Sequence, residues 1–122
     1  MHPLWLLLAL ACGPKTPVET GLASWYGPGF AGKPTASGEP FRPARRTAAH
    51  PKLPFGTVVR VTRVDTGQSV RVVVNDRGPY KKGRIIDLSR KAARRIDLID
   101  EAVAQVEVRV VGCKARYEAC ER

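Results

Sequence analysis

Two adjacent segments of alternating apolar and polar residues constrain the fold of this chain more than any other feature. Residues Thr57–Val64 alternate for most of their length, and Ser69–Val74 alternate again after the turn Asp65–Gly67. Successive side chains of a strand point to opposite faces, so two such segments joined by a short turn predict an antiparallel hairpin. The sequence therefore indicates a β fold built around this hairpin.

Three further segments have the pattern of short strands, and one has the pattern of a helix. Strands are expected at Leu22–Tyr26, Arg84–Leu88 and Val106–Val111, while Ser89 is a good N-cap for a helix over Arg90–Ile96. Many short strands with a single helix favour a small closed β-barrel over a sandwich, because closure removes exposed strand edges.

Composition limits the partners and the metal chemistry. The 122 residues are 43% hydrophobic, enough to bury a core, and 21 Lys and Arg against 11 Asp and Glu give a formal net charge of +10. This charge favours anionic partners such as nucleic acid, phospholipid or an acidic cell-wall polymer. The two histidines and three cysteines are too far apart in sequence to suggest a Cys/His zinc site, so no metal is expected.

The first residues have the pattern of an export signal. Leu4–Ala11 is an unbroken apolar run, too short to cross a bilayer, and it leads into Cys12 through small residues. This pattern resembles a bacterial lipobox. It predicts a signal peptide over residues 1–11, a lipidated Cys12 followed by a tether over residues 12–20, and a lipid-anchored place in the bacterial cell envelope. The alternative is an apolar N-terminal strand with a buried thiol.

The remaining two cysteines lie in a C-terminal tail over residues 112–122. If Cys12 is acylated, Cys113 and Cys120 remain as a pair, and an exported protein meets oxidising conditions that favour a disulfide. Two free thiols on the tail are the alternative.

Three kinds of chemistry fit the residues poorly. Gly27–Lys33 matches the first seven positions of a phosphate-binding P-loop, but Pro34 stands where Ser or Thr must hold magnesium. The aromatic residues show no interleaving with the basic ones, so nucleic-acid binding has only the net charge in its favour and is not expected. A Ser/His/Asp hydrolase would have to use His50, and no nucleophile elbow accompanies it.

Three polar residues in turns form the remaining candidate site. Asp76 ends the strongest predicted strand, Glu39 lies in Thr35–Glu39, and His50 closes a short Thr-Ala-Ala-His run. Loops at strand ends are where a rigid barrel displays groups to a substrate, and a carboxyl group there can protonate a glycosidic oxygen. From the residues alone, Asp76 can equally cap a turn, Glu39 can be a surface charge, and His50 can be a satisfied imidazole.

Six blocks of sequence, in order, resemble the rare lipoprotein A family. They are Gly21–Gly27, Thr35–Glu39, Thr47–His50, Leu53–Thr57, Val74–Pro79 and Arg84–Ser89. The resemblance implies a mainly β fold over residues 21–111, namely a small six-stranded double-psi β-barrel with one or two short helices, related in shape to expansins. It also implies an endolytic peptidoglycan lytic transglycosylase. Such an enzyme cleaves the bond from N-acetylmuramic acid to N-acetylglucosamine, preferably in peptide-poor glycan strands, and leaves 1,6-anhydro ends.

The same resemblance implies roles for individual residues. Its Ser-Gly-Glu, Ala-Ala-His and Asn-Asp-Arg-Gly-Pro motifs fall on Glu39, His50 and Asp76, which would be the catalytic residues. Asp76 would act as acid and then base, while Glu39 and His50 would orient the sugar and stabilise the developing charge.

Aromatic and basic neighbours complete the expected site. Trp25 and Tyr26 either stack on a sugar or fill the barrel, and Arg77 either contacts the substrate or pairs with a carboxylate. No cofactor is expected, and the expected partners are glycan strands and, through Cys12, a membrane. The rival function is a non-catalytic, expansin-like module that binds polysaccharide in the same groove.

Overall fold

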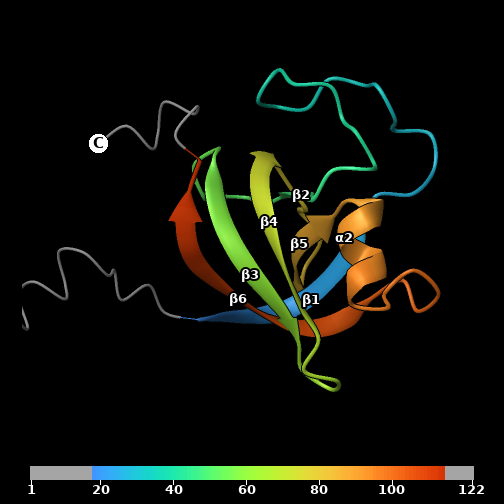
Figure 1. Cartoon of the computed structure of the whole chain (residues 1–122), viewed down its shortest axis with the longest axis vertical. Coiled ribbons are helices and arrows are strands. Elements are labelled where there is room, and N and C mark those ends of the chain that lie inside the picture. The colour runs from blue at the N-terminus through green and yellow to red at the C-terminus, as the bar shows by residue number, and fades with distance from the viewer. Residues whose placement is uncertain (1–17, 115–122) are drawn as a thin grey trace, which may run out of the picture.

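The computed structural model describes residues 18–114, which form a closed six-stranded β-barrel (Figure 1). Among these residues there is one helix, α2 (Arg90–Arg95). The strands in chain order are β1 (Glu19–Trp25), β2 (Thr47–Ala49), β3 (Thr57–Arg63), β4 (Ser69–Asp76), β5 (Arg84–Leu88) and β6 (Ala104–Cys113). The mainly β barrel class expected from the sequence is thus confirmed.

The order of strands around the barrel differs from their order in the chain. It runs β1-β5-β2-β4-β3-β6, with β1 parallel to β5, β2 parallel to β4, and the other pairs antiparallel. Parallel neighbours cannot be joined by a tight hairpin, so the chain must cross over between them. The long loop between β1 and β2 lies over the ends of β2 and β4 (Figure 1).

The β3–β4 hairpin shows why the alternating segments fold this way. Val59 pairs with Val72 and Val61 with Val70, and all four side chains are buried. Each buried valine contributes about 1.5–3 kcal/mol by leaving water, so the register that places all of them inside is strongly favoured. The intervening residues, including Arg60, necessarily line the outer face of the barrel.

Helix α2 begins and ends close to the positions that the sequence predicts. The Ser89 hydroxyl accepts a hydrogen bond from the Ala92 amide at 3.3 Å, and Ile96 is the C-cap residue. Ala92, Ala93 and Ile96 are buried in the main core, so this short helix packs against the barrel.

A buried guanidinium fastens the β3–β4 turn to the segment after α2. Arg63 is 5% exposed and donates to the carbonyls of Ile96 at 3.0 Å and Asp97 at 2.8 Å. It also pairs with Asp65 at 2.7 Å and with Glu101. Because a buried cation is costly unless fully partnered, these four acceptors explain how Arg63 is tolerated at an inward-facing strand position.

Strand boundaries differ from expectation most in β1, β2 and β6. β1 begins at Glu19, inside the segment expected to be a tether, and β6 continues to Cys113. β2 has only three residues and no residue pattern predicted it. Its two alanines are buried between β4 and β5, where small side chains allow close packing.

Several expectations fall on the ends of the chain. The signal peptide, the lipidated Cys12 and the pairing of Cys113 with Cys120 lie wholly or partly outside the described residues; Cys113 itself is disulfide-bonded. No helix in the described part of the chain is long and apolar enough to span a membrane.

Candidate active site

Asp76 lies at the end of β4, where its carboxylate is held by three hydrogen-bond donors. Oδ2 accepts from the Tyr26 hydroxyl at 2.5 Å, and Oδ1 accepts from the amides of Ala36 at 2.8 Å and Arg77 at 2.9 Å. Both acceptor positions of Oδ1 are therefore occupied, whereas Oδ2 has one donor. Asp76 is half-buried, and Oδ2 has a second lone pair besides the one that Tyr26 uses.

The loop between β1 and β2 brings Tyr26 to Asp76. The Tyr26 ring stacks on Phe41 with centroids 4.2 Å apart and meets Phe30 edge-on at 5.6 Å. Burial, reinforced by the hydrogen bond to Asp76 and by its negative charge, raises the pKa of Tyr26 far above its ordinary value. The phenol therefore stays protonated and acts as a permanent donor to Asp76.

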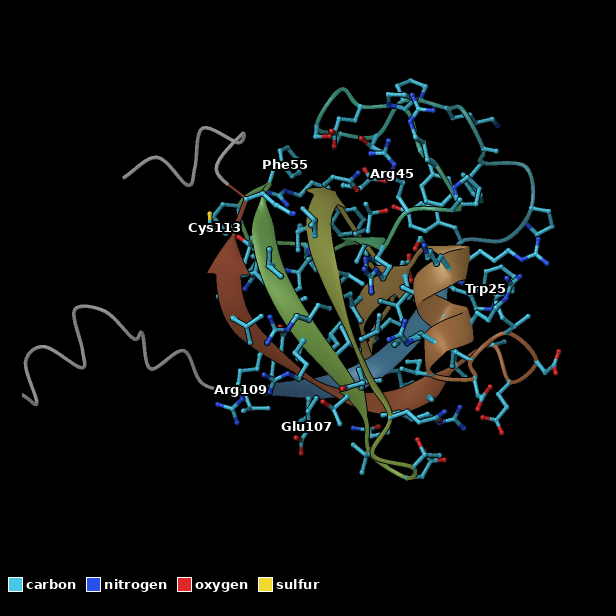
Figure 2. All side chains as sticks on the ribbon, in the orientation of Figure 1. Trp25, Arg45, Phe55, Glu107, Arg109 and Cys113 are labelled. Atoms are coloured by element: carbon cyan, nitrogen blue, oxygen red, sulfur yellow. The ribbon has the colours of Figure 1, made fainter. Side chains whose placement is uncertain are left out.

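The two aromatic residues expected at the site, Trp25 and Tyr26, both contact other residues of the chain. Tyr26 packs on Phe41 and binds Asp76, while Trp25 is partly buried against the core and lies near α2 (Figure 2). Trp25 thus packs against the barrel core, whereas Tyr26 packs on the loop between β1 and β2.

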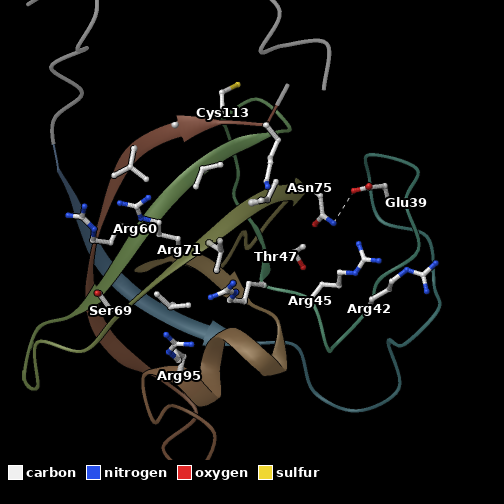
Figure 3. A pocket seen from close by; sticks show the side chains of 18 of the residues that line it. Glu39, Arg42, Arg45, Thr47, Arg60, Ser69, Arg71, Asn75, Arg95 and Cys113 are labelled. Atoms are coloured by element: carbon white, nitrogen blue, oxygen red, sulfur yellow. Dashed lines mark hydrogen bonds between the residues drawn. The ribbon is translucent and has the colours of Figure 1, made fainter. Parts of the chain in front are cut away.

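Glu39 contacts β4 at Asn75, the residue before Asp76. Its Oε1 accepts from Asn75 Nδ2 at 3.3 Å, and the Ser37 amide donates to the Asn75 carbonyl at 3.2 Å (Figure 3). The loop Thr35–Glu39 is closed by a hydrogen bond from the Thr35 amide to the Glu39 carbonyl at 2.8 Å. One short loop thus supplies the Ala36 amide that donates to Asp76 and the Glu39 carboxylate that accepts from Asn75.

Asn75 is a buried residue whose side chain is only partly satisfied. It is 4% exposed, and its Oδ1 has no hydrogen-bond partner among residues 18–114. A buried unpaired acceptor costs about 1–3 kcal/mol, so Asn75 does not serve stability alone. Its side-chain amide group donates to the Glu39 carboxylate.

His50 is buried, and both nitrogens of its ring are engaged. Nδ1 accepts from the amides of Lys52 at 3.0 Å and Leu53 at 3.1 Å, so the proton lies on Nε2, which donates to Glu19 Oε1 at 2.8 Å. The His50 amide also donates to the Asp76 carbonyl at 3.1 Å. The imidazole is therefore fully used in holding the turn after β2 against β1.

Arg77 also binds the turn after β2, through backbone carbonyls. Its Nη1 donates to the carbonyls of Leu53 at 2.8 Å and His50 at 3.2 Å, and the guanidinium lies 4.1 Å from the Phe55 ring centroid. No ion pair joins Arg77 to a carboxylate in the described part of the chain. The guanidinium supports the backbone next to Asp76.

The structure thus brings Asp76, Glu39 and His50 to one end of the barrel, although their side chains do not bond directly to one another. Glu39 reaches the site through Asn75, and His50 reaches it through the backbone of Asp76. Asp76 and Glu39 are half-buried, whereas His50 is 4% exposed.

Sequence reasoning missed two acidic residues of this region. Glu19, the partner of His50, was assigned to the tether, and no local pattern marks it as part of the site. Asp87 accepts a hydrogen bond from the Ser24 hydroxyl and contributes to the raised pKa of Tyr26. A charged residue inside the apolar run of β5 was the signal that could have identified Asp87.

Asp87 lies two strands from Asp76. Both residues pair in register with Ala49 of β2, one from β5 and the other from β4. Neighbouring strands are about 4.8 Å apart, so the two backbones are separated by about 10 Å.

In the described range no group of three or more His, Cys, Asp or Glu residues is arranged to hold a metal ion.

Comparison with known proteins finds a matching family model and several relatives of similar sequence. A family model described as lytic transglycolase matches residues 18–108. The chain is 56% identical over 94 residues to the "Probable endolytic peptidoglycan transglycosylase RlpA" of a Nostoc species, covering 75% of this chain and 25% of the relative. It is 50% identical over 92 residues to the endolytic peptidoglycan transglycosylase RlpA of Campylobacter jejuni, covering 75% and 34%. The chain therefore spans about a quarter to a third of these relatives.

Solved structures with the same fold are more distant in sequence. The Streptomyces papain inhibitor superposes with a TM-score of 0.63 at 24% identity, over 80% of this chain and 97% of that one. A mutant Clavibacter michiganensis expansin in complex with cellohexaose superposes with a TM-score of 0.62 at 24% identity, over 78% of this chain and 50% of that one. These similarities concern the barrel alone.

Proposed function

This chain belongs to the lytic transglycolase family of double-psi β-barrels, and on that premise we propose that it is an endolytic peptidoglycan lytic transglycosylase. The substrate is the glycan strand, and the bond cleaved joins C1 of N-acetylmuramic acid to the oxygen on C4 of N-acetylglucosamine. The observation that carries the proposal is the Asp76 carboxylate, held by three donors at the strand end where the family motif falls.

The proposed reaction uses Asp76 twice. The protonated carboxyl group gives its proton to the glycosidic oxygen as the C1–O bond breaks, and the C6 hydroxyl of the same muramyl residue attacks C1. The carboxylate then takes the hydroxyl proton, so the 1,6-anhydro ring closes and no water is consumed. Because Oδ1 already accepts two amides, Oδ2 is the oxygen that carries the transferred proton.

The neighbouring side chains have separate roles in this proposal. Tyr26 holds Oδ2 in position, and its raised pKa prevents it from competing as a base. Glu39, oriented by Asn75, stabilises the positive charge that develops on the sugar ring. His50 acts as a positioning residue, since both of its nitrogens already have protein partners.

The direct test uses peptidoglycan sacculi from which an amidase has removed the stem peptides. Wild-type protein is expected to release fragments with 1,6-anhydro ends, detected by mass spectrometry. Asp76→Asn is expected to lower the release by at least about a hundredfold, the smallest usual contribution of a general acid/base. Asp100→Asn, at an exposed turn outside the site, is the matched control and should leave the rate unchanged.

The same assay tests the second candidate function. The barrel shares its fold with expansins, and a non-catalytic module would bind the strands with Asp76 as a hydrogen-bond acceptor. Binding without anhydro ends between about pH 4 and pH 8 would favour that module over the enzyme.

We also propose that the protein is exported and held in the bacterial cell envelope by a lipid on Cys12. The apolar run before Cys12 and the small residues next to it support this assignment. Metabolic labelling with a palmitate analogue should mark the wild-type chain and not Cys12→Ser. Loss of label from Cys113→Ser instead would contradict the assignment.

A further inference from the structure

A groove with a volume of about 1080 Å³ runs along the outside of the barrel. It lies between the outer face of the β3–β4 hairpin and the loop that leads into β2 (Figure 3). Among the described residues that line it, Glu39 is the one acidic side chain. Seven of the lining residues are cationic, namely Arg42, Arg45, Arg46, Arg60, Arg71, Arg95 and Lys114.

Three arginines on the outer face of the sheet lie opposite one another on neighbouring strands, where their positive charges repel. Arg60 pairs directly with Arg71 of β4 on one side and with Arg109 of β6 on the other. Like charges opposite one another on a sheet are destabilising. Arg60, Arg71 and Arg109 take part in none of the ion pairs that form within residues 18–114. An external anion would relieve this repulsion.

The lining indicates what kind of anion fits. Six of the seven cations are arginines, whose planar guanidinium groups bind carboxylate or phosphate in a bidentate manner. Among the described lining residues there is no aromatic side chain on which a nucleotide base could stack. Thr47 and Ser69 provide hydroxyls for uncharged polar groups. This combination favours a glycan that bears anionic substituents over a nucleic acid.

The length and the position of the groove connect it to the candidate active site. It follows β4 from Ser69 to Asn75, which is about 20 Å at 3.3 Å per residue and long enough for several sugar units. It ends at Glu39 and Asn75, and the loop that carries Glu39 also supplies the Ala36 amide to Asp76. One end of the groove is therefore formed by the same loop that contacts the Asp76 carboxylate.

We propose that this arginine groove binds the carboxylates attached along a peptidoglycan strand, on sugars beyond the bond that is cleaved. The inference rests on the proposed function for the identity of the glycan. Two sources supply the same chemistry, the free lactyl carboxylate of peptide-free muramic acid and the carboxylates of stem peptides. Arg60 and Arg71 are the central contacts.

The test measures binding without cleavage, using the full chain with Asp76→Asn as background. Binding is measured to amidase-treated strands, to strands with intact peptides, to chitin as an uncharged glycan, and to inorganic polyphosphate. Adding Arg60→Gln with Arg71→Gln should weaken binding to the carboxylated strands about tenfold, as expected for two exposed ion pairs. Binding to chitin should not change, and about 0.5 M salt should remove the difference. The arm with the larger loss identifies the source of the carboxylate.

Two controls distinguish binding from folding. Arg90→Gln with Arg94→Gln removes the same charge from exposed positions on α2 outside the groove, and should change binding less than about twofold. The groove variant should melt at the same temperature as its parent or higher, because it removes a like-charge repulsion. A lower melting temperature would assign these arginines a structural role and overturn the proposal.

The outcomes separate the groove from the enzyme. Unchanged binding to both carboxylated strands in the groove variant overturns the groove, whether or not the wild type releases anhydro ends. Arginine-dependent binding to polyphosphate alone overturns it in favour of a phosphate polymer. Arginine-dependent binding to the strands without anhydro ends from the wild type supports the groove and contradicts the proposed enzyme.

Discussion

Replacing Tyr26 by Phe removes one hydroxyl from the candidate site and leaves the ring in place. The ring should keep its stacking on Phe41, so the change isolates the hydrogen bond to Asp76. Asp76 would then be held only through Oδ1 by two backbone amides. Oδ2, the oxygen proposed to transfer the proton, would be free to rotate with the carboxylate or to bind water.

The size of the effect follows from the contact. A hydrogen bond to an ionised group contributes about 1.5–3 kcal/mol, and water at the half-buried carboxylate replaces part of it, so a loss of about 1 kcal/mol is expected. For a domain of this size that lowers the melting temperature by about 4–8 °C. Mispositioning of a catalytic group by about 1 Å costs on the order of a hundredfold, so kcat should fall about 10- to 100-fold with KM unchanged.

The assay is the release of anhydro ends at several substrate concentrations, with circular dichroism to follow melting. A Tyr26→Phe variant with wild-type kcat would refute the role of Tyr26 in positioning Asp76. A raised KM with unchanged kcat would instead assign the hydroxyl to substrate binding.

The same variant, Tyr26→Phe, tests how the stability of the protein changes at alkaline pH. In the folded state the pKa of Tyr26 is raised, chiefly by burial, so the folded chain keeps a proton that the unfolded chain loses above about pH 10. Stability of the wild type should therefore fall as pH rises above about 10, and it should fall less steeply for Tyr26→Phe. Equal slopes in urea unfolding would contradict the burial of this phenol.

Three further changes test contacts around the site. His50→Asn keeps an acceptor for the turn amides, so it should retain more activity than His50→Ala; equal losses would argue against positioning through Nδ1. Gly21→Ala places a methyl group 2.6 Å from Ile85 Cγ2, so urea unfolding should show a loss of about 1–3 kcal/mol; wild-type stability would mean that this contact relaxes freely. The hydrogen bond to Arg63 lowers the pKa of Asp65 in the folded state. The wild type should therefore lose stability as the pH falls below about 4, and Asp65→Asn should lose less over the same range in acid titration.

Local patterns were enough to predict the β3–β4 hairpin and α2. In the hairpin, alternation along Thr57–Val64 and Ser69–Val74 reports directly which side chains face the core. In the helix, the Ser89 cap is a contact between residues close in sequence. By contrast, β2 is a strand because of its neighbours β4 and β5, and three residues carry no readable period.

The site divides in the same way. Asp76, Glu39 and His50 could be selected from the sequence because they lie in motif-like turns. Their partners could not, since the bond from Tyr26 to Asp76 spans 50 positions and that from His50 to Glu19 spans 31. Such contacts depend on the crossovers of the barrel, which no local pattern encodes. For the same reason the arginine groove, which is lined by β3, β4, β6, α2 and a distant loop, was visible in the sequence only as excess positive charge.

The central claim is that Asp76 promotes attack by a hydroxyl of the substrate itself, and one isotope measurement tests it. Peptide-free sacculi are digested in water enriched in oxygen-18, and the new muramyl ends are weighed by mass spectrometry. Ends that lack oxygen-18, formed by the wild type and not by Asp76→Asn, are the predicted result. Ends that carry oxygen-18, or unlabelled anhydro ends formed equally well by Asp76→Asn, would contradict the account.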